Sequence, residues 1–338
     1  MRSYLVPATA RGLDDLRLIE RPSVKPGPGQ VRLRPRAATL NGRDQYIVHG
    51  TYLLFRLQRD TVPLSDGAGE IIDVGPDVTR FKPGDRVMTT FFQRTPAAMP
   101  EEIEQQLGGP LDGVLAEEVV LDQDGVVPIP GDLSFAEAAA LPCAALTAWS
   151  ALMETGRPLR PGDTVLVLGT GGVSVFGLQF ARAAGARVIV TSSSDAKLAR
   201  AKDLGAFAGL NYRTTPDWHQ EVLRLTQGRG ADCILEVGGY GTLSRSIQCL
   251  APNGRICLIG VLAGPGETNN LHLLRPKRGS IHGIAVGPRD MLLRMNRAVT
   301  AQGLRPVIDR VFPFDRAKEA YRAQAAGDFF GKIAIEIP

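Results

Sequence analysis

The chain has 338 residues, which is long for one compact domain and favours two. Hydrophobic residues make up 44% and charged residues 22% of it, so the chain can bury a large core and is not intrinsically disordered. The formal net charge is only +4, and the basic residues are scattered without interleaved aromatic side chains, so we expect no nucleic-acid partner.

Up to about residue 130 the sequence alternates short β-like runs with Pro- and Gly-rich turns such as KPGPG (25–29) and KPGD (82–85). Helical patterns are scarce in this part. The runs predict strands at residues 30–34, 69–74, 85–89 and 116–121. We therefore expect a twisted, barrel-like β domain.

From about residue 145 apolar runs alternate with helical patterns. The pattern predicts strands at 164–169, 187–191, 207–211, 232–237, 254–260 and 280–286, and helices at 173–184, 195–204, 216–226 and 243–250. Near-continuous apolar strands alternating with helices indicate an α/β fold with a doubly wound, parallel, six-stranded sheet. The tail predicts helices at 290–302 and 315–326 and strands near Val311 and at 332–337, and we expect it to return to the first domain.

The four cysteines, Cys143, Cys233, Cys249 and Cys257, form no C-x-x-C pair, which argues against a zinc ribbon or a redox dithiol. The N-terminal segment has no apolar core after a basic start, so we expect it not to be a signal peptide, and no apolar stretch is long enough to span a membrane. We expect a soluble, cytoplasmic protein with no membrane partner.

A glycine-rich turn, GTGGVS (169–174), lies between the first strand and first helix of the α/β half. Glycines permit the tight turn and let the backbone approach a pyrophosphate, and the helix N-terminus supplies N–H groups and a positive dipole end. We expect Gly169, Gly171, Gly172 and Val173 to bind a dinucleotide. Ser174 stands where a third glycine is usual. The alternative is a turn that closes the sheet without a ligand.

The end of the second strand selects the dinucleotide. An acidic residue there favours NAD, whereas this chain has Ser192, Ser193 and Ser194, with Lys197 one turn into the next helix. Hydroxyls and an ammonium suit a 2′-phosphate, so we favour NADP(H) over NAD(H). Asp195 leaves NAD(H) open, and its alternative role is the N-cap of the helix.

Several segments together resemble the medium-chain dehydrogenase/reductase superfamily, and within it zinc-free quinone oxidoreductases and zinc-free alcohol-dehydrogenase-like proteins. They are VRLRPRAATLNGRD (31–44), GAGEIIDVGPDVTRFKPGDRV (67–87), ALPCAALTAWSAL (140–152), the segment 164–204, NYRTTPDW (211–218) and GDFFGKIAI (327–335). The resemblance implies a GroES-like catalytic domain at 1–144 and 289–338, a Rossmann domain at 145–288, a cleft between them and a homodimer.

The resemblance also bears on zinc. In zinc-dependent relatives a Cys matches Asn41, a His-Glu pair matches Ser65–Asp66 and a third ligand matches Cys143, so one potential ligand of three remains here. A catalytic zinc needs three protein ligands, so we expect no metal. Residues 91–112 contain no cysteine, so the four-cysteine lobe of zinc relatives is also absent. The segment 95–109 replaces it, with a helix possible at 100–107, and either caps the cleft or is a surface excursion.

The resemblance implies that Asn41, Asp44, Tyr46 and Tyr52 line the substrate site, where an amide or phenol can donate to a carbonyl oxygen. The alternatives are a structural hydrogen bond from backbone to Asp44 and simple packing of the tyrosines. It also implies a set of cofactor contacts. They are Thr147, Tyr212, Val237, Gly238, Gly239, Ile259, Gly260, Val261, Ile284, Val286 and Lys332. For Lys332 a solvated lysine at a strand end is the alternative.

The sequence therefore predicts a zinc-independent, NADP(H)-dependent oxidoreductase that transfers hydride to a quinone or an α,β-unsaturated carbonyl, as an enoyl reductase does. One alternative is a zinc-free alcohol dehydrogenase or ketone reductase. Another is an NADP-binding protein without catalytic activity.

Overall fold

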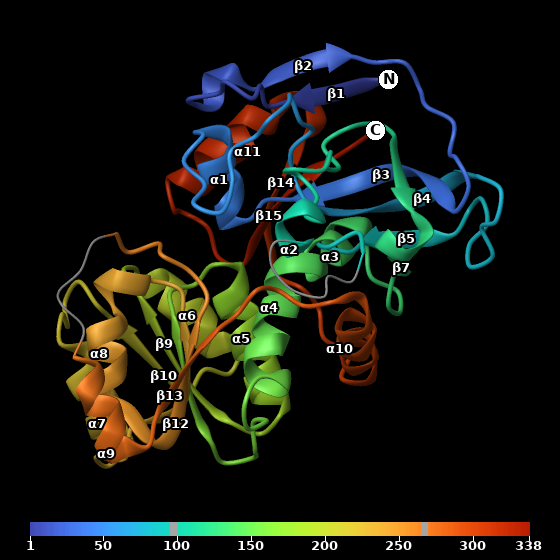
Figure 1. Cartoon of the computed structure of the whole chain (residues 1–338). Helices are drawn as coiled ribbons and strands as arrows, with labels where there is room; N and C mark the ends of the chain where they lie inside the picture. Colours follow the sequence, from blue (N-terminus) through green and yellow to red (C-terminus); the bar gives the residue numbers. More distant parts are fainter. Residues whose placement is uncertain (95–100, 265–269) are drawn as a thin grey trace. The chain divides into compact units, whose positions relative to one another are not determined.

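The computed structural model describes residues 1–94, 101–264 and 270–338. These residues form two compact units (Figure 1). Unit 1 comprises Met1–Leu146 and Gly287–Pro338, and unit 2 comprises Thr147–Val286. The α/β class is confirmed, with a largely antiparallel sheet in unit 1 and a parallel sheet in unit 2.

Unit 2 contains the expected parallel six-stranded sheet. Its strands are β8 (Thr164–Leu168), β9 (Arg187–Ser192), β10 (Ala208–Asn211), β11 (Ala231–Glu236), β12 (Leu250–Leu258) and β13 (Ser280–Gly283). The order is β10-β9-β8-β11-β12-β13, so the winding reverses next to the first strand. In such sheets ligands bind beyond the carboxyl ends of the strands at this reversal.

Helices cover both faces of this sheet. They are α5 (Gly172–Ala183), α6 (Asp195–Asp203), α7 (Trp218–Leu225), α8 (Leu243–Gln248) and the short α9 (Leu274–Lys277). Helices α7 and α8 pack together on one face, and α5 lies on the other (Figure 1). Every residue of β8 and β11 is buried, which explains why both strands are largely apolar in sequence.

Unit 1 contains a sheet of the order β14-β15-β3-β4-β5-β7, with β6 paired to β3. Its strands are β3 (Gln30–Thr39), β4 (Asp66–Val74), β5 (Arg86–Thr89), β6 (Val119–Asp122), β7 (Val126–Pro128), β14 (Ile308–Pro313) and β15 (Lys332–Glu336). Strands β1 (Arg2–Leu5) and β2 (Arg17–Glu20) form a separate pair. The tail does return to the first unit, because β15 runs antiparallel to β3 with Ala334 opposite Thr39.

Several helices in unit 1 and at its junction with unit 2 are absent from the sequence-based prediction. They are α1 (Gly42–Val48), α3 (Phe135–Ala139) and a helical run through Leu141–Ala145, α4 (Leu146–Trp149) and Ser150–Glu154. The start of α3 could have been predicted from the sequence, because Ser134 and Glu137 have the spacing of a capping box and form one. The tail helices α10 (Arg289–Ala301) and α11 (Ala317–Ala325) lie within a few residues of their expected bounds.

Two expected boundaries in unit 2 are wrong. Strand β12 begins at Leu250, because the strand enters the sheet directly after α8. Strand β13 ends at Gly283, so Ile284 and Val286 lie beyond it, and Val286 has a positive φ of 49° that no strand allows. Of the expected helix at 100–107, α2 covers Glu101–Glu104, and residues 95–100 lie outside the described part.

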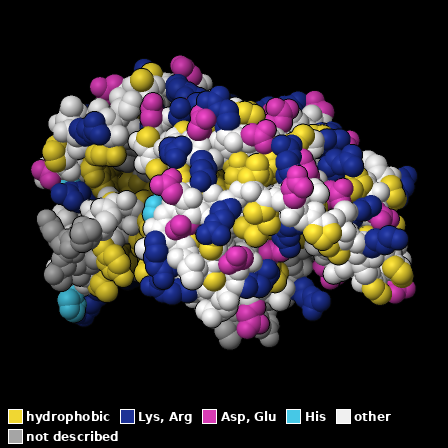
Figure 2. All heavy atoms as spheres, turned by 90° about the horizontal axis from the view of Figure 1, so that it is seen from above, with side chains coloured by type: hydrophobic (Ala, Val, Ile, Leu, Met, Phe, Trp, Pro, Cys, Tyr) yellow, Lys and Arg dark blue, Asp and Glu magenta, His cyan; other side chains and the backbone are white. Residues whose placement is uncertain are grey.

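The charge on the surface and the length of the helices relate to the nucleic-acid and membrane partners considered above. On the face drawn in Figure 2, Lys and Arg side chains are intermixed with Asp and Glu. Across residues 1–94, 101–264 and 270–338, every helix is too short or too polar to cross a membrane.

Gly69 offers a test of the sheet in unit 1. A Cβ there would lie 2.0 Å from the Arg34 carbonyl oxygen and 2.7 Å from Pro35 Cα, both backbone atoms that cannot move aside. We expect Gly69→Ala to lower the free energy of unfolding by about 3 kcal/mol or more, measured by urea denaturation. Gly12→Ala is the control, because a Cβ at Gly12 meets no atom within 4 Å. Equal stability of the two variants would contradict the β3–β4 pairing.

Candidate functional site

The glycine-rich turn of unit 2 has the backbone that a dinucleotide requires. Gly169 directly follows β8 with a φ of 76°, and its N–H donates to Thr191 Oγ1 at 3.2 Å, which ties the turn to β9. Gly171 caps α5, and Gly172 begins it. A Cβ on Gly169 or Gly171 would meet no atom within 4 Å, so the space above the turn is open.

The close packing of helix on strand depends on a glycine that the sequence interpretation missed. Ser174 is buried, and its hydroxyl donates to the Leu168 carbonyl at 2.6 Å. One turn later, a Cβ on Gly177 would lie 2.6 Å from Leu235 Cδ2 on β11. Gly177 therefore allows α5 to approach the sheet, and its position in the sequence, three residues after Ser174, is the signal that was available.

The hydroxyls of two of the three serines at the end of β9 accept hydrogen bonds from the backbone, and within the described residues the third does not. Ser192 is buried, and its Oγ accepts from Ser194 N–H at 3.3 Å. Ser194 caps α6 by accepting from Lys197 N–H at 3.4 Å. In the described part of the chain no partner is found for the Ser193 hydroxyl. The N-cap interpretation of Asp195 is wrong, because Ser194 has that role and Asp195 accepts from Asn211 Nδ2 at 2.8 Å.

The remaining cofactor candidates in unit 2 follow the carboxyl ends of its strands, apart from Thr147, which is buried in α4. Tyr212 comes directly after β10, is 43% exposed and donates its N–H to Ser192 O at 3.0 Å. The other positions follow β11, β12 and β13. They are Val237, Gly238, Gly239, Ile259, Gly260, Val261, Ile284 and Val286.

A carboxylate absent from the predicted set organises the loop after β11. Glu236 is fully buried, and its Oε1 accepts from the N–H groups of Gly238 and Gly239 at 2.9 and 3.0 Å. Its Oε1 also accepts from Thr242, and its Oε2 accepts from Ser246. Burial raises the pKa of Glu236 despite these donors. The side chain therefore holds the glycine turn in one conformation.

Unit 1 holds a buried polar cluster, which we call the Lys332 ring and which consists of Asn41, Ser65, Asp66 and Lys332. Lys332 Nζ donates to Asn41 Oδ1 and to Leu40 O, both at 2.7 Å, and forms an ion pair with Asp66 Oδ2 at 3.5 Å. Ser65 Oγ donates to Asp66 Oδ1 at 2.6 Å and lies 3.5 Å from Asn41 Nδ2. Lys332 is only 2% exposed, so the solvated-lysine alternative is wrong.

The residues of this cluster do not fit a zinc ion. Zinc binds thiolate, imidazole and carboxylate, whereas an amide and an ammonium stand at the centre of the cluster. Burial raises the pKa of the Cys143 thiol far above its usual range, which disfavours the thiolate that a metal needs. Within residues 1–94, 101–264 and 270–338, no three His, Cys, Asp or Glu side chains are grouped closely enough to hold a metal.

Asp44 lies in the first turn of α1, where a structural role was the alternative. Its Oδ2 accepts from the backbone N–H of Asn41 at 2.6 Å, which fixes the start of the helix. Its other oxygen, Oδ1, is buried without a hydrogen-bond partner among the described residues. Burial raises the pKa of Asp44 to about 6, against the opposing effects of Arg43 and the Asn41 N–H.

Of the two candidate tyrosines, Tyr52 packs in an aromatic cluster. Its ring centroid lies 5.0 Å from that of Phe55, and the Arg43 guanidinium lies 5.4 Å from the Tyr52 ring and 4.8 Å from Phe91. Burial raises the pKa of Tyr52. Tyr52 also lines a cavity of about 180 Å³ with Ile47 and Phe55. Tyr46 lies on α1 and is half-buried.

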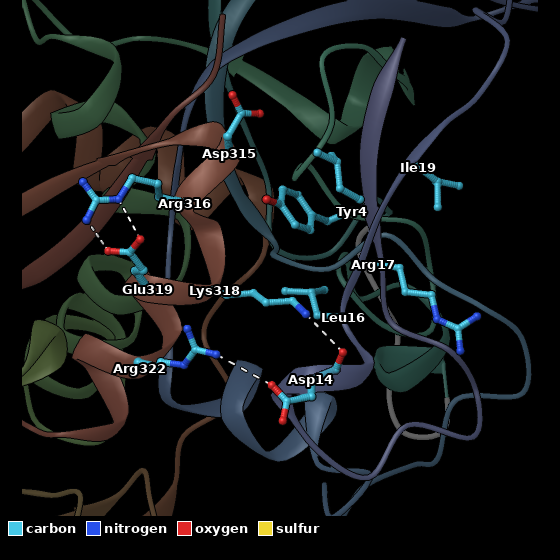
Figure 3. Close-up of a pocket in the computed structure, with 11 residues that line it drawn as sticks. Tyr4, Asp14, Leu16, Arg17, Ile19, Asp315, Arg316, Lys318, Glu319 and Arg322 are labelled. Atoms are coloured by element: carbon cyan, nitrogen blue, oxygen red, sulfur yellow. Dashed lines mark hydrogen bonds and ion pairs between the residues drawn. The ribbon is translucent and has the colours of Figure 1, made fainter.

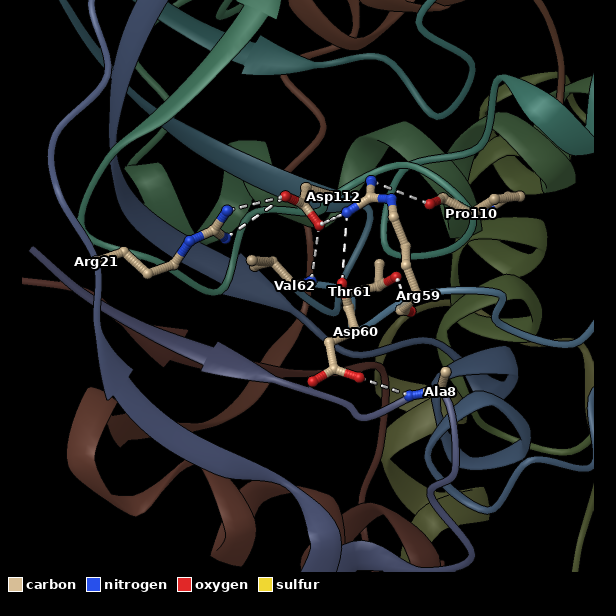
Figure 4. A network of polar contacts seen from close by, with 8 residues as sticks. All are labelled: Ala8, Arg21, Arg59, Asp60, Thr61, Val62, Pro110 and Asp112. Carbon is tan, nitrogen blue, oxygen red and sulfur yellow. Dashed lines mark hydrogen bonds and ion pairs between the residues drawn. The ribbon is translucent and has the colours of Figure 1, made fainter.

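A polar network supports the segment that carries Ser65. Asp112 Oδ1 accepts from Arg59 Nη1 at 2.9 Å and from Val62 N–H at 3.1 Å, and Arg21 pairs with its other oxygen (Figure 4). The chain then passes through Leu64, which is fully buried and has a φ of 70°. A left-handed leucine is strained, so the surrounding packing must impose the conformation that turns Ser65 into the ring.

A second hollow of unit 1, about 680 Å³ in volume, lies away from the predicted residues. Arg316 pairs with Glu319 and Arg322 pairs with Asp14 at its edge (Figure 3). Lys318 donates to Asp14 O at 3.1 Å. Lys318 and Arg322 both lie on α11, so these contacts tie the helix to the segment around Asp14.

Two protein-family models match the chain. The alcohol dehydrogenase GroES-like domain matches residues 27–131, and the zinc-binding dehydrogenase domain matches residues 172–300. A zinc-type alcohol dehydrogenase-like protein of Schizosaccharomyces pombe is 44% identical over 342 residues and covers 99% of each chain. A quinone oxidoreductase of Pseudomonas aeruginosa is 35% identical over 259 residues, covering 76% of this chain and 73% of its own.

Solved structures also resemble this chain over its whole length. The crystal structure of an NAD-dependent alcohol dehydrogenase superposes with a TM-score of 0.92 at 35% identity and covers 100% of both chains. These matches agree with the GroES-like and Rossmann expectations for the two units.

Asp44 makes stability depend on pH. Its pKa is about 6 in the folded protein and about 4 in the unfolded chain. The protonated carboxyl therefore contributes its full stabilisation below about pH 4, and this stabilisation is lost as the pH rises from about 4 through 6. Asp44→Asn removes the effect, so its unfolding free energy relative to wild type should rise by about 3 kcal/mol between about pH 4 and pH 8.

Chemical denaturation at the two pH values measures this change. Asp203→Asn, on the exposed end of α6, is the control for removal of one carboxylate. A pH-independent difference for Asp44→Asn would show that the buried carboxyl is not perturbed.

Proposed function

The chain belongs to the medium-chain dehydrogenase/reductase superfamily of NAD(P)H-dependent oxidoreductases, and we propose that it is an NADPH-dependent reductase of quinones or α,β-unsaturated carbonyls that works without zinc. The observation that supports the proposal is the Lys332 ring, in which the Asn41 amide accepts from a buried ammonium at a position that matches a zinc ligand of relatives.

The turn of unit 2 fits a dinucleotide. Open space above Gly169 and Gly171 and the free N-terminal N–H groups of α5 suit a pyrophosphate. The loop fixed by Glu236 and the ends of β12 and β13 would hold the nicotinamide side. When bound, the reduced nicotinamide supplies the hydride.

NADPH is favoured over NADH by the residues after β9. The Ser193 hydroxyl and Lys197 lie beside the N-terminus of α6, where hydroxyl, ammonium and helix dipole together suit a 2′-phosphate. The second candidate is NADH, which the similar NAD-dependent alcohol dehydrogenase and the exposed Asp195 favour.

For the acceptor, Asn41 is the donor of choice. When hydride adds to the carbon conjugated with a carbonyl, negative charge develops on the carbonyl oxygen, and a preorganised N–H stabilises it. Tyr52 has a phenol whose pKa is raised, so it stays protonated and can donate as well. The second candidate reaction, reduction of a ketone or aldehyde, would use the same donors.

Oxidation of NADPH and NADH with a panel of quinones, enones, ketones and aldehydes, with and without a chelator, tests the proposal. We expect NADPH-dependent reduction of a quinone or of an enone C=C bond, identified by the product, with rates that the chelator leaves unchanged. Chelator-sensitive turnover would overturn zinc independence. Cofactor binding without turnover on any acceptor would favour a non-catalytic protein.

The cofactor preference is tested on α6. We expect Lys197→Ala to weaken NADPH binding by about tenfold, since a hydrogen bond to a charged group contributes about 1.5 kcal/mol, and to leave NADH binding unchanged. Lys202→Ala, on the same helix but two turns from its start, is the matched control. Fluorescence titration measures both dissociation constants, and an equal loss for NADPH and NADH would argue against a 2′-phosphate contact.

A further inference from the structure

The hydrogen bonds of the Lys332 ring run in one direction, and this fixes the Asn41 amide. An ammonium can only donate, so the Asn41 atom 2.7 Å from Lys332 Nζ must be the oxygen, Oδ1. Ser65 Oγ gives its hydrogen to Asp66 Oδ1 at 2.6 Å, so it can only accept from Asn41 Nδ2. The amide nitrogen has two hydrogens, and the ring uses one of them.

The same ammonium lies among the positions that match the zinc ligands of relatives. It contacts Asn41 directly and pairs with Asp66, and the charges of Lys332 and Asp66 both act on the Cys143 thiol. A cation therefore does stand at this place in unit 1, but it is the end of a side chain from β15.

Stability alone gives a poor account of this lysine. Burying an ammonium and a carboxylate costs several kcal/mol per ion, and apolar side chains of similar volume commonly stabilise a fold equally well. What the ammonium adds is direction, because it distinguishes the oxygen of an amide from its nitrogen.

We propose that Lys332 is a positioning residue that replaces the metal of zinc-dependent relatives and holds the Asn41 amide so that its second N–H donates to the substrate carbonyl oxygen. Without the ammonium the amide can rotate by half a turn and present its oxygen, which repels the developing oxyanion. The inference rests on the proposed function for its kinetic part, whereas the occupancy of the metal position is independent of it.

Kinetics test the positioning role. Lys332→Met alone would leave the Asp66 carboxylate buried and unpaired, and Asp66→Asn alone would leave the ammonium so, and we therefore compare the neutral double variant Lys332→Met/Asp66→Asn with wild type. Lys332→Arg, which keeps a donor cation beside Asn41 and Asp66, is the conservative control. We expect kcat for an enone to be at least about tenfold lower in the double variant than in wild type, with the NADPH dissociation constant the same in both and with kcat largely retained in Lys332→Arg. A kcat of the double variant within about twofold of wild type, or a loss of NADPH binding that accounts for the whole effect, would overturn the positioning role.

Metal binding tests the same placement without any turnover. Asn41→Cys/Ser65→His restores two zinc-type ligands beside Cys143, and Lys332→Met then removes the ammonium from the centre. We expect the triple variant to bind Co²⁺, with the visible absorption of a tetrahedral cobalt–thiolate site, at least about tenfold more tightly than the double variant that keeps Lys332. Thermal melts identify variants that fail to fold.

The two experiments separate the possible failures. If wild type turns over no acceptor, the proposed function fails, and the cobalt titration still decides whether Lys332 holds the metal position. If the triple variant binds Co²⁺ no better than the double variant, the ammonium does not exclude a metal and the inference is overturned.

Discussion

A buried ammonium is the constraint on which the candidate site of unit 1 depends. Lys332 lies at the start of β15, Asn41 follows β3, and Asp66 begins β4, so the ion pair with Asp66 and the hydrogen bond to Asn41 together join three segments that are far apart in the sequence. An unpaired charge in a protein interior costs several kcal/mol, so the fold that buries Lys332 must also bring its partners to it. The antiparallel register of β15 with β3 does this, because Ala334 opposite Thr39 directs Lys332 to Asn41.

Unit 2 uses a buried charge in a comparable way. Glu236 is fully buried, and its carboxylate accepts hydrogen bonds from the N–H groups of Gly238 and Gly239, which would otherwise be unsatisfied. In both units a buried charged side chain fixes the backbone or the amide that carries a predicted contact. Such residues set geometry, and their value lies in a site that is rigid before a ligand binds.

Where the sequence predicted the fold well, short-range patterns were sufficient. The apolar runs of β8 and β11 are buried on both faces, and the parallel sheet follows from strands that alternate with helices. The prediction failed for α1, because this short helix begins with Gly42, a poor helix former, and depends on the Asp44 carboxylate and on tertiary contacts for its start. It failed at Val286 as well, because a left-handed valine is imposed by its surroundings and has no local signal.

The sequence by itself determined the family, the glycine-rich turn and the absence of zinc-type ligands at Asn41 and Ser65, because each is a matter of residue type at a fixed spacing. Only the tertiary structure decided what the remaining residues do. It separated the buried Ser192 from Ser193, moved the helix cap from Asp195 to Ser194 and assigned close packing to Gly177. It also placed Lys332 against Asn41, since the direction of a hydrogen bond across 291 residues of chain has no trace in the linear sequence.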